Sequence, residues 1–205
     1  MSELFMPRVP ANIDGQDQNT DLVSLALISQ RRIYICGEIT NQTALTVTTQ
    51  LLYLDDRGQD DITLVINSPG GSVTAGLAIY DMIKSGIASD VVTIAAGMAA
   101  SMGAFLLAAG RKGKRFAAPN AQIMLHQPLG GVQGQATDIS LVAEHIQQVK
   151  RRLAEILAEH CGRPVKTVLK DTERDRWLSP LQAKEYGLID HIGFPNLPLE
   201  VSFHE

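Results

Sequence analysis

Ser101 has the local surroundings of a nucleophilic serine. It stands between a predicted buried strand and a predicted helix, where small side chains would let a peptide backbone approach the hydroxyl. Its small neighbours are Gly97, Ala99, Ala100, Gly103 and Ala104. A helix N-terminus also offers unpaired N–H groups to a developing oxyanion. The Gly-x-Ser-x-Gly pattern of hydrolases is absent because residue 99 is alanine, so a serine in a tightly packed turn is the alternative.

A nucleophilic serine needs a base, normally a histidine that is oriented by a carboxylate. His126 is the best candidate of the five histidines because it follows a predicted strand, and strand ends project side chains into clefts. The other four histidines are His145, His160, His191 and His204. Three downstream acids could orient the base, and sequence spacing does not choose among Asp171, Asp175 and Asp190.

The elements that must hold these side chains alternate between apolar strands and helices. Strands are predicted at 32–36, 62–66, 91–96, 115–118 and 122–125, and a short one near His191. Helices are predicted at 22–28, 40–54 and 75–84, from about residue 101 onward, and at 137–160. This alternation predicts an α/β fold with right-handed crossovers. Because the chain shows no repeat, linker or domain break, residues 1–205 are expected to form a single domain.

The segment 137–160 is the longest with a helical pattern. Its apolar residues recur at spacings of three and four: Ile139, Val142, Ile146, Val149, Leu153 and Ile156. So narrow a stripe is typical of a helix that packs against another helix, and equally of an amphipathic helix on its own sheet. The glycine-rich segment 130–134 before it is either an extended edge or a loop.

Composition and charge exclude several function classes. The 18 basic and 22 acidic residues give a net charge of −4, which argues against a nucleic-acid partner. Cys36 and Cys161 are too few for a disulfide scaffold and fit no zinc spacing, so no metal is expected. Residues 91–109 carry no charge, but the small residues at their centre indicate a buried strand and turn rather than a membrane span. The first residues lack the pattern of a secretory signal, so we expect a cytoplasmic protein.

Four short motifs follow one another along the chain. They are Asn-Ser-Pro-Gly-Gly at 67–71, Gly-Met-Ala-Ala-Ser-Met-Gly-Ala-Phe-Leu-Leu at 97–107, Met-Leu-His-Gln-Pro-Leu-Gly-Gly at 124–131 and Asp-Thr-Glu-Arg-Asp-Arg-Trp at 171–177. Together they resemble the proteolytic subunits of Clp proteases, the ClpP family. The resemblance runs from about residue 32 to residue 193, which is most of the chain.

This resemblance implies a role for each residue that matches the family motifs. Ser101 is implied as the nucleophile, His126 as the general base and Asp175 as the acid that orients the base. The backbone N–H groups of Gly71 and Met102 are implied to form the oxyanion hole. Extended peptide is implied to add as a strand beside two segments, 71–73 and 129–132. Besides Gly71, the implied binding residues in these segments are Ser72, Val73, Leu129, Gly130, Gly131 and Val132. Such pairing reads the main chain, which explains a broad sequence tolerance.

The implied fold is the one shared by ClpP and the crotonases, a right-handed stack of ββα units with a projecting handle helix, here residues 137–160. Subunits of the family form heptameric rings, and two rings stack through their handles and enclose the active sites. Ile146 and Val149 are then implied to lie between the rings. Glu173 and Arg174 match a pair that links ring contact to alignment of the catalytic aspartate.

The implied activity is that of a serine endopeptidase, which cleaves unfolded proteins to short peptides. An AAA+ unfoldase of the ClpX, ClpA or ClpC type feeds such a chamber and uses the ATP, so this chain itself is expected to need no cofactor. No nucleic acid and no membrane are expected as partners.

The chain departs from the family pattern where unfoldases dock. Within the divergent N-terminal segment 1–30, residues 12–21 replace the usual Arg-Gly-Glu-Arg-Ala-Tyr-Asp stretch. Thr63 and Val65 stand where the family has tyrosines, although Phe116 is retained. Loss of aromatic contacts argues against tight docking. A second hypothesis is therefore a mainly structural or regulatory subunit that works beside another ClpP paralogue in a mixed ring. A third is a crotonase-type acyl-CoA enzyme, which the full Ser-His-Asp set disfavours.

Overall fold

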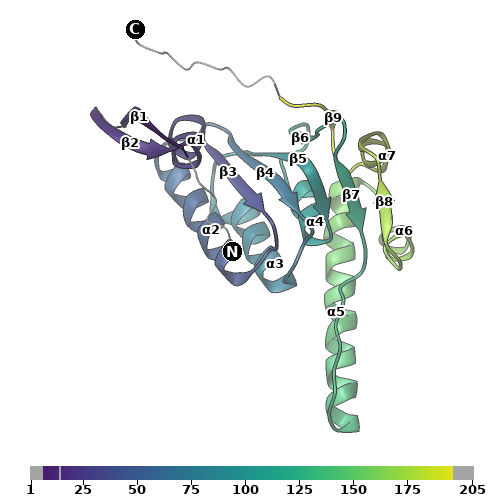
Figure 1. Ribbon diagram of the computed structural model, residues 1–205. Coiled ribbons are helices and arrows are strands. Elements are labelled where there is room, and N and C mark those ends of the chain that lie inside the picture. Colours follow the sequence, from purple (N-terminus) through teal and green to yellow (C-terminus); the bar gives the residue numbers. More distant parts are fainter. Residues whose placement is uncertain (1–6, 14, 196–205) are drawn as a thin grey trace.

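A forked sheet organises the molecule (Figure 1). The computed structural model describes residues 7–13 and 15–195. The strands of the sheet are β3 (Arg32–Cys36), β4 (Ile62–Ser68), β5 (Val91–Ala100), β6 (Arg115–Ala117), β7 (Gln122–Leu125), β8 (Arg176–Leu178) and β9 (His191–Ile192). Their order is β3-β4-β5-β6-β9, and β7 pairs with both β5 and β8. The β7–β8 pair is antiparallel and the other pairs are parallel.

The fork lies within β5, which changes its partner halfway along. Residues 93–95 pair with β6, whereas residues 98–100 pair with β7. Between them Gly97 has a φ of +94°, and the pairing of β5 with β4 shifts its register. The sequence predicted that this strand ends at residue 96 in a tight turn, and that prediction was wrong. The strand continues to Ala100 because glycine absorbs the bend and the small side chains after it fit the buried space.

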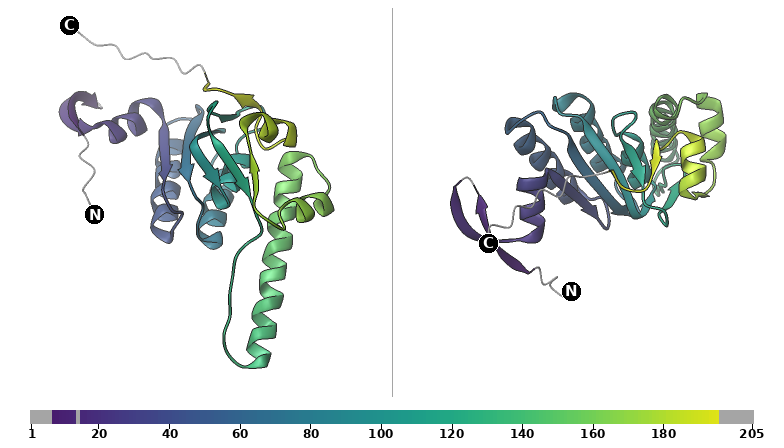
Figure 2. Two further views of the ribbon diagram at one scale, coloured as in Figure 1. Left: turned by 45° about the vertical axis from the view of Figure 1, so that its right-hand side comes forward. Right: turned by 90° about the horizontal axis from the view of Figure 1, so that it is seen from above.

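Helices pack on the sheet and at its edges. They are α1 (Leu22–Gln30), α2 (Asn41–Asp56), α3 (Val73–Asp81), α4 (Met102–Ala108), α5 (Ala136–Cys161), α6 (Val165–Asp171) and α7 (Pro180–Tyr186). Helix α2 begins after a capping box formed by Thr40 and Thr43, and it buries one apolar stripe. Helix α3 passes into a π-helical turn, Met82–Gly86, where the sequence predicted a single helix over 75–84. Strands β1 (Arg8–Ile13) and β2 (Gln16–Asp21) form a separate antiparallel hairpin next to α1 (Figure 2).

The uncharged segment 91–109 forms β5 and α4 in the centre of the core. Among the helices that the structure describes, none has the length and hydropathy needed to cross a membrane. Protein covers most of the apolar residues of this segment: Ile94, Leu106 and Leu107 have almost no exposed surface.

Helix α5 projects far beyond the sheet (Figure 1). At 1.5 Å per residue, its 26 residues span about 39 Å. Its buried residues lie near its C-terminus: Ala154, Ile156, Leu157 and Ala158. Towards the N-terminus, Ile139 and Val142 of the same apolar stripe are exposed. The stripe therefore packs on the body of the molecule at its C-terminal end, whereas its other end projects uncovered, and packing of that end against another helix stays a prediction.

Candidate active site

Strand pairing brings Ser101, His126 and Asp175 together. The parallel β5–β7 pair matches Ala100 with Met124, and the Ser101 N–H donates to the Met124 carbonyl at 2.9 Å. This register places Ser101 next to Leu125, one residue before His126. The antiparallel β7–β8 pair matches Leu125 with Arg176, so one further step places His126 opposite Asp175.

The three side chains form a chain of hydrogen bonds. Nε2 of His126 lies 2.8 Å from Oγ of Ser101, and Nδ1 of His126 lies 3.2 Å from Oδ1 of Asp175. In the tautomer with the proton on Nδ1, the imidazole donates to the carboxylate and accepts from the serine hydroxyl. The His126 side chain is 15% exposed, whereas that of Asp175 is 61% exposed. This arrangement can deprotonate the serine and stabilise the imidazolium that results.

The backbone of Ser101 is held in a strained conformation. Its φ of 54° and ψ of −121° lie in a region that non-glycine residues rarely adopt, at a cost of about 1–3 kcal/mol. The strain is tolerated because the peptide is fixed on both sides: the Ser101 N–H bonds to β7, and its carbonyl accepts the Phe105 N–H at 3.0 Å. Such a junction between a strand and a helix presents the hydroxyl outside both elements.

Two backbone N–H groups beside Ser101 are suited to bind an oxyanion. Met102 is the first residue of α4, so its N–H has no partner within the helix. Gly71 and Ile39 form an isolated β-bridge. Its two hydrogen bonds, each 2.8 Å long, run from the Ile39 N–H to the Gly70 carbonyl and from the Ser72 N–H to the Ile39 carbonyl. The bridge therefore does not involve the N–H of Gly71 itself. Gly70 lies so close that a Cβ there would be 3.1 Å from N of Met102.

A small apolar pocket of about 40 Å³ opens beside Ser101 and His126. Its apolar lining comes from α3, α4, β7, α5 and α6: Val73, Phe105, Leu125, Leu153, Ala154, Leu157 and Val168. The volume exceeds the ~10–15 Å³ that one water needs, so part of an apolar side chain fits it. The predicted binding residue Val73 lies in this lining, but the contribution of α5 and α6 was missed, because sequence does not show which helix covers a strand end.

The remaining predicted binding residues lie near this pocket without forming a strand. Ser72 is the N-cap of α3, where its Oγ accepts the Ala75 N–H at 3.3 Å. Residues 129–132 belong to a loop that runs back along α5, so the loop alternative for the glycine-rich segment is the one observed (Figure 1). A Cβ on Gly130 would lie 2.9 Å from Cδ1 of Ile146. The backbone of this loop is free of sheet pairing within the described residues and can accept a strand.

The other candidate acids are engaged elsewhere. Asp171 pairs with Arg176 at 2.6 Å, and Asp190 pairs with the buried guanidinium of Arg115 at 2.6 Å. Burial disfavours the charge of Asp190, but Arg115 outweighs it and holds the pKa of that carboxyl below its usual value. Of the three acids, only Asp175 is hydrogen-bonded to His126.

The other histidines that the structure describes do not approach Ser101. Nε2 of His160 lies 3.0 Å from the Tyr80 hydroxyl, and burial, with a smaller effect of Lys84, lowers the pKa of His160 to about 4. His191 contacts the Gly113 carbonyl at 3.1 Å, and His145 is exposed on the projecting part of α5. His204 lies outside the described residues. Within those residues, no group of three or more His, Cys, Asp or Glu is arranged to hold a metal ion.

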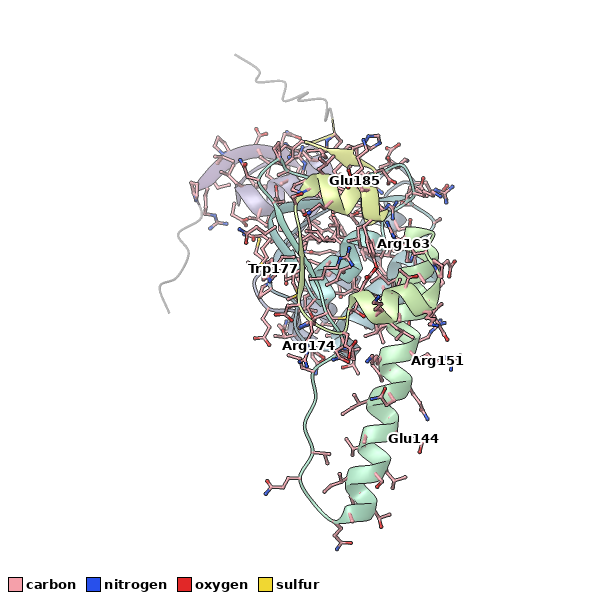
Figure 3. All side chains as sticks on the ribbon, turned by 90° about the vertical axis from the view of Figure 1, so that its right-hand side faces the viewer. Glu144, Arg151, Arg163, Arg174, Trp177 and Glu185 are labelled. Atoms are coloured by element: carbon pink, nitrogen blue, oxygen red, sulfur yellow. The ribbon has the colours of Figure 1, made fainter. Side chains whose placement is uncertain are left out.

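Gln127 is a contributor to the site that the sequence did not single out. Its backbone N–H donates to the Thr172 carbonyl at 2.7 Å, and its side-chain amide donates to the Glu173 carbonyl at 2.9 Å. These bonds attach the segment that carries Asp175 to the segment that carries His126. Glu173 and Arg174 themselves are exposed, and Arg174 lies where the loop beside α5 leaves the body of the molecule (Figure 3).

A comparison with protein-family models gives a match over most of the chain. Residues 14–196 match the model described as Clp protease. The match includes the three hydrogen-bonded side chains, both candidate oxyanion donors and the whole of α5.

Gly70→Ala should destabilise the protein by about 1–3 kcal/mol more than Gly113→Ala, which is the usual cost of crowding a packed site. Both glycines have positive φ, +99° and +89°, so alanine is strained at either position. A Cβ on Gly113 would meet nothing within 4 Å, whereas one on Gly70 would lie 2.6 Å from Cβ of Ser101. Urea unfolding followed by circular dichroism measures both variants. Equal losses would show that Gly70 does not pack against Ser101.

Proposed function

Because the chain belongs to the Clp protease family, we propose that it is a serine endopeptidase subunit in which Ser101 is the nucleophile. The observation that carries this proposal is the hydrogen-bonded chain from Ser101 through His126 to Asp175, beside two available backbone N–H groups. A crotonase-type enzyme would need only the N–H groups, and the aligned imidazole and carboxylate would then have no role.

Peptide cleavage follows from the positions of these groups. Oγ of Ser101 attacks the scissile carbonyl while Nε2 of His126 takes its proton, and the Asp175 carboxylate stabilises the imidazolium. The N–H groups of Gly71 and Met102 stabilise the oxyanion of the tetrahedral intermediate. His126 then protonates the leaving amine, and an acyl-enzyme on Ser101 remains. In the second half, His126 deprotonates a water that attacks the ester, and returns the proton to Ser101. No metal or organic cofactor enters these steps.

Extended peptide would bind between Gly71–Val73 and the loop 129–132. The backbone of either segment can pair with a substrate strand, which places its scissile carbonyl over Ser101. The apolar pocket beside His126 would take the side chain that precedes the scissile bond. Because most contacts are with main chain, many unfolded proteins would serve as substrates.

Apolar surfaces at opposite ends of the subunit support assembly into rings. Tyr34, Leu45, Leu52 and Tyr53 are exposed on β3 and α2. Trp177 and Leu181 are exposed on β8 and α7, at the other end of the molecule (Figure 1). A contact between two unlike surfaces repeats head to tail and closes into a ring when the rotation allows. We propose that the ring is heptameric, as in the family, and that two rings stack through α5.

Stacked rings would enclose the active sites and control access to them. An AAA+ unfoldase would supply unfolded chains, in a cytoplasmic system of protein quality control. The pocket for unfoldase loops would differ from that of the family, because Thr63 is buried and neither Thr63 nor Val65 offers an aromatic surface. This difference favours, as a second candidate, a mainly structural or regulatory subunit that relies on a second paralogue for docking.

Ser101→Ala should abolish peptidase activity and leave the assembly intact, because it removes one small hydroxyl. Loss of the nucleophile in serine proteases costs on the order of 10⁶ in kcat. A fluorogenic peptide assay on the purified oligomer measures the loss, and a fluorophosphonate probe should label the wild type alone. Activity within tenfold of the wild type would refute the catalytic assignment. Labelled but inactive wild-type oligomer would favour the regulatory candidate.

Asp175→Asn should lower kcat by about 10⁴ if the carboxylate holds His126 in the required tautomer. The change keeps the size of the side chain and removes only its charge and one acceptor oxygen. Asp81→Asn is the matched control, because Asp81 is an exposed carboxylate at the end of α3, distant in sequence from Asp175. This variant should leave kcat unchanged. Full activity of the Asp175→Asn oligomer would assign the orienting role to another acid.

Replacement of Ile146 and Val149 by aspartate should split stacked rings into single rings. Each charge would be desolvated between apolar side chains, at a cost of several kcal/mol. Native mass spectrometry should show half the mass, and peptidase activity should fall as Asp175 loses its alignment. His145→Asp with Gln148→Asp places the same charges on the exposed face of α5 and should leave double rings. Intact, fully active double rings with the first pair would mean that this stripe packs within its own subunit; circular dichroism verifies folding in both cases.

A further inference from the structure

Asp175 is held by its backbone and not by burial of its side chain. The carboxylate is 61% exposed, and among the described residues the only hydrogen bond or ion pair assigned to it is the 3.2 Å contact with His126. An exposed side chain with one contact has many rotamers available, whereas catalysis needs one position. The segment from Thr172 to Asp175 must therefore supply the order that packing does not.

This segment is closed at its two ends by an ion pair. Asp171 is the last residue of α6 and Arg176 is the first residue of β8. Oδ1 of Asp171 lies 2.6 Å from Nη1 of Arg176, so the pair spans the four residues between them. Their side chains are only 18% and 40% exposed. The backbone of the segment is held in addition by Gln127, which bonds to the carbonyls of Thr172 and Glu173.

Tyr186 anchors the ion pair to the core. Its side chain is buried, and its hydroxyl donates to Oδ2 of Asp171 at 3.1 Å. Burial, reinforced by the Asp171 carboxylate, raises the pKa of the Tyr186 phenol, so the hydroxyl stays a donor at neutral pH. The guanidinium of Arg163 lies over the Tyr186 ring at 4.1 Å, and that of Arg176 lies near it at 5.1 Å. Both carboxylate oxygens of Asp171 are therefore in use and its position is fixed.

We propose that Asp171, Arg176 and Tyr186 form a clip that positions the Asp175 carboxylate against His126. The proposal rests on the endopeptidase function proposed above. The clip lies within one subunit, so it acts whether or not rings are stacked. A partly exposed ion pair contributes little to folding stability. Loss of the clip should therefore appear in catalysis and not in the unfolding transition.

Arg176→Met removes the guanidinium and keeps most of the side-chain length. We expect kcat of the purified full-chain oligomer to fall by about 10- to 100-fold with KM unchanged, since misplacement of a catalytic group by ~1 Å costs about 10². Arg176→Lys restores a positive charge and should recover part of the loss. Tyr186→Phe keeps the packing, removes only the hydroxyl, and should lower kcat by a smaller factor. Lys114→Met removes the ion pairs of Lys114 with Asp61 and Asp90 on another part of the surface and should be silent.

A double-mutant cycle separates positioning from a general structural role. If Arg176 acts through Asp175, then Arg176→Met should have no further effect on kcat in the Asp175→Asn background. The same fold loss in both backgrounds would overturn the proposal, and so would a loss that accompanies dissociation of the rings in native mass spectrometry.

The same set of variants distinguishes failure of the clip from failure of the proposed function. Full activity of Arg176→Met, while Ser101→Ala and Asp175→Asn are inactive, overturns the clip alone. Full activity of Ser101→Ala overturns the proposed function, and the clip with it.

Discussion

The change of partner within β5 is the constraint on which the site depends. A straight strand would pair with β6 or with β7 along its whole length, and Ser101 would not meet the end of β7. Gly97 makes the bend, and the break in the ladder is repaired by the side chain of Asn67, whose Oδ1 accepts the Met98 N–H at 3.1 Å. A Cβ at position 97 would lie 2.9 Å from that oxygen, so the bend and its repair require glycine. The Asn-Ser-Pro-Gly-Gly motif thus supports β5 as well as forming one wall of the site.

The three hydrogen-bonded side chains differ in how firmly they are held. Ser101 and His126 are each the first residue after a paired strand of the core. The strained backbone of Ser101 is in addition hydrogen-bonded through both its N–H and its carbonyl. Asp175 lies on an exposed segment that leads directly into β8, a strand of three residues. Paired strands in a core open only at a high free energy, whereas an exposed segment with few buried contacts opens at a low one. The acid is therefore the member of the site whose position responds most readily to changes elsewhere in the protein.

Residue types and local pattern were enough to single out Ser101 and His126 as candidates: Ser101 by its small neighbours before a predicted helix, and His126 by its place at the end of a clearly marked apolar run. They did not choose the acid, because its position depends on antiparallel pairing of β8, and a strand of three residues has no readable period. Only the family resemblance singled out Asp175. The end of β5 was predicted wrongly because Gly and Ala between apolar runs are typical of a turn, and only the tertiary packing shows that they fill a strand. Contacts between distant segments, such as Gln127 with Thr172, have no local signal at all.

Helix α5 connects the pocket beside the active site to the surface proposed for ring stacking. Leu153, Ala154 and Leu157 line the pocket, and Ile146 and Val149 lie one to two turns earlier on the same stripe. A hydrogen-bonded helix is stiff over this length, so its projecting end cannot rotate or translate without moving the residues that line the pocket. A contact made by the exposed half of the stripe would thus bear on the substrate site directly, through one rigid element. Burial of an otherwise uncovered apolar stripe would provide the driving force for that contact, and the shape of the pocket would depend on it.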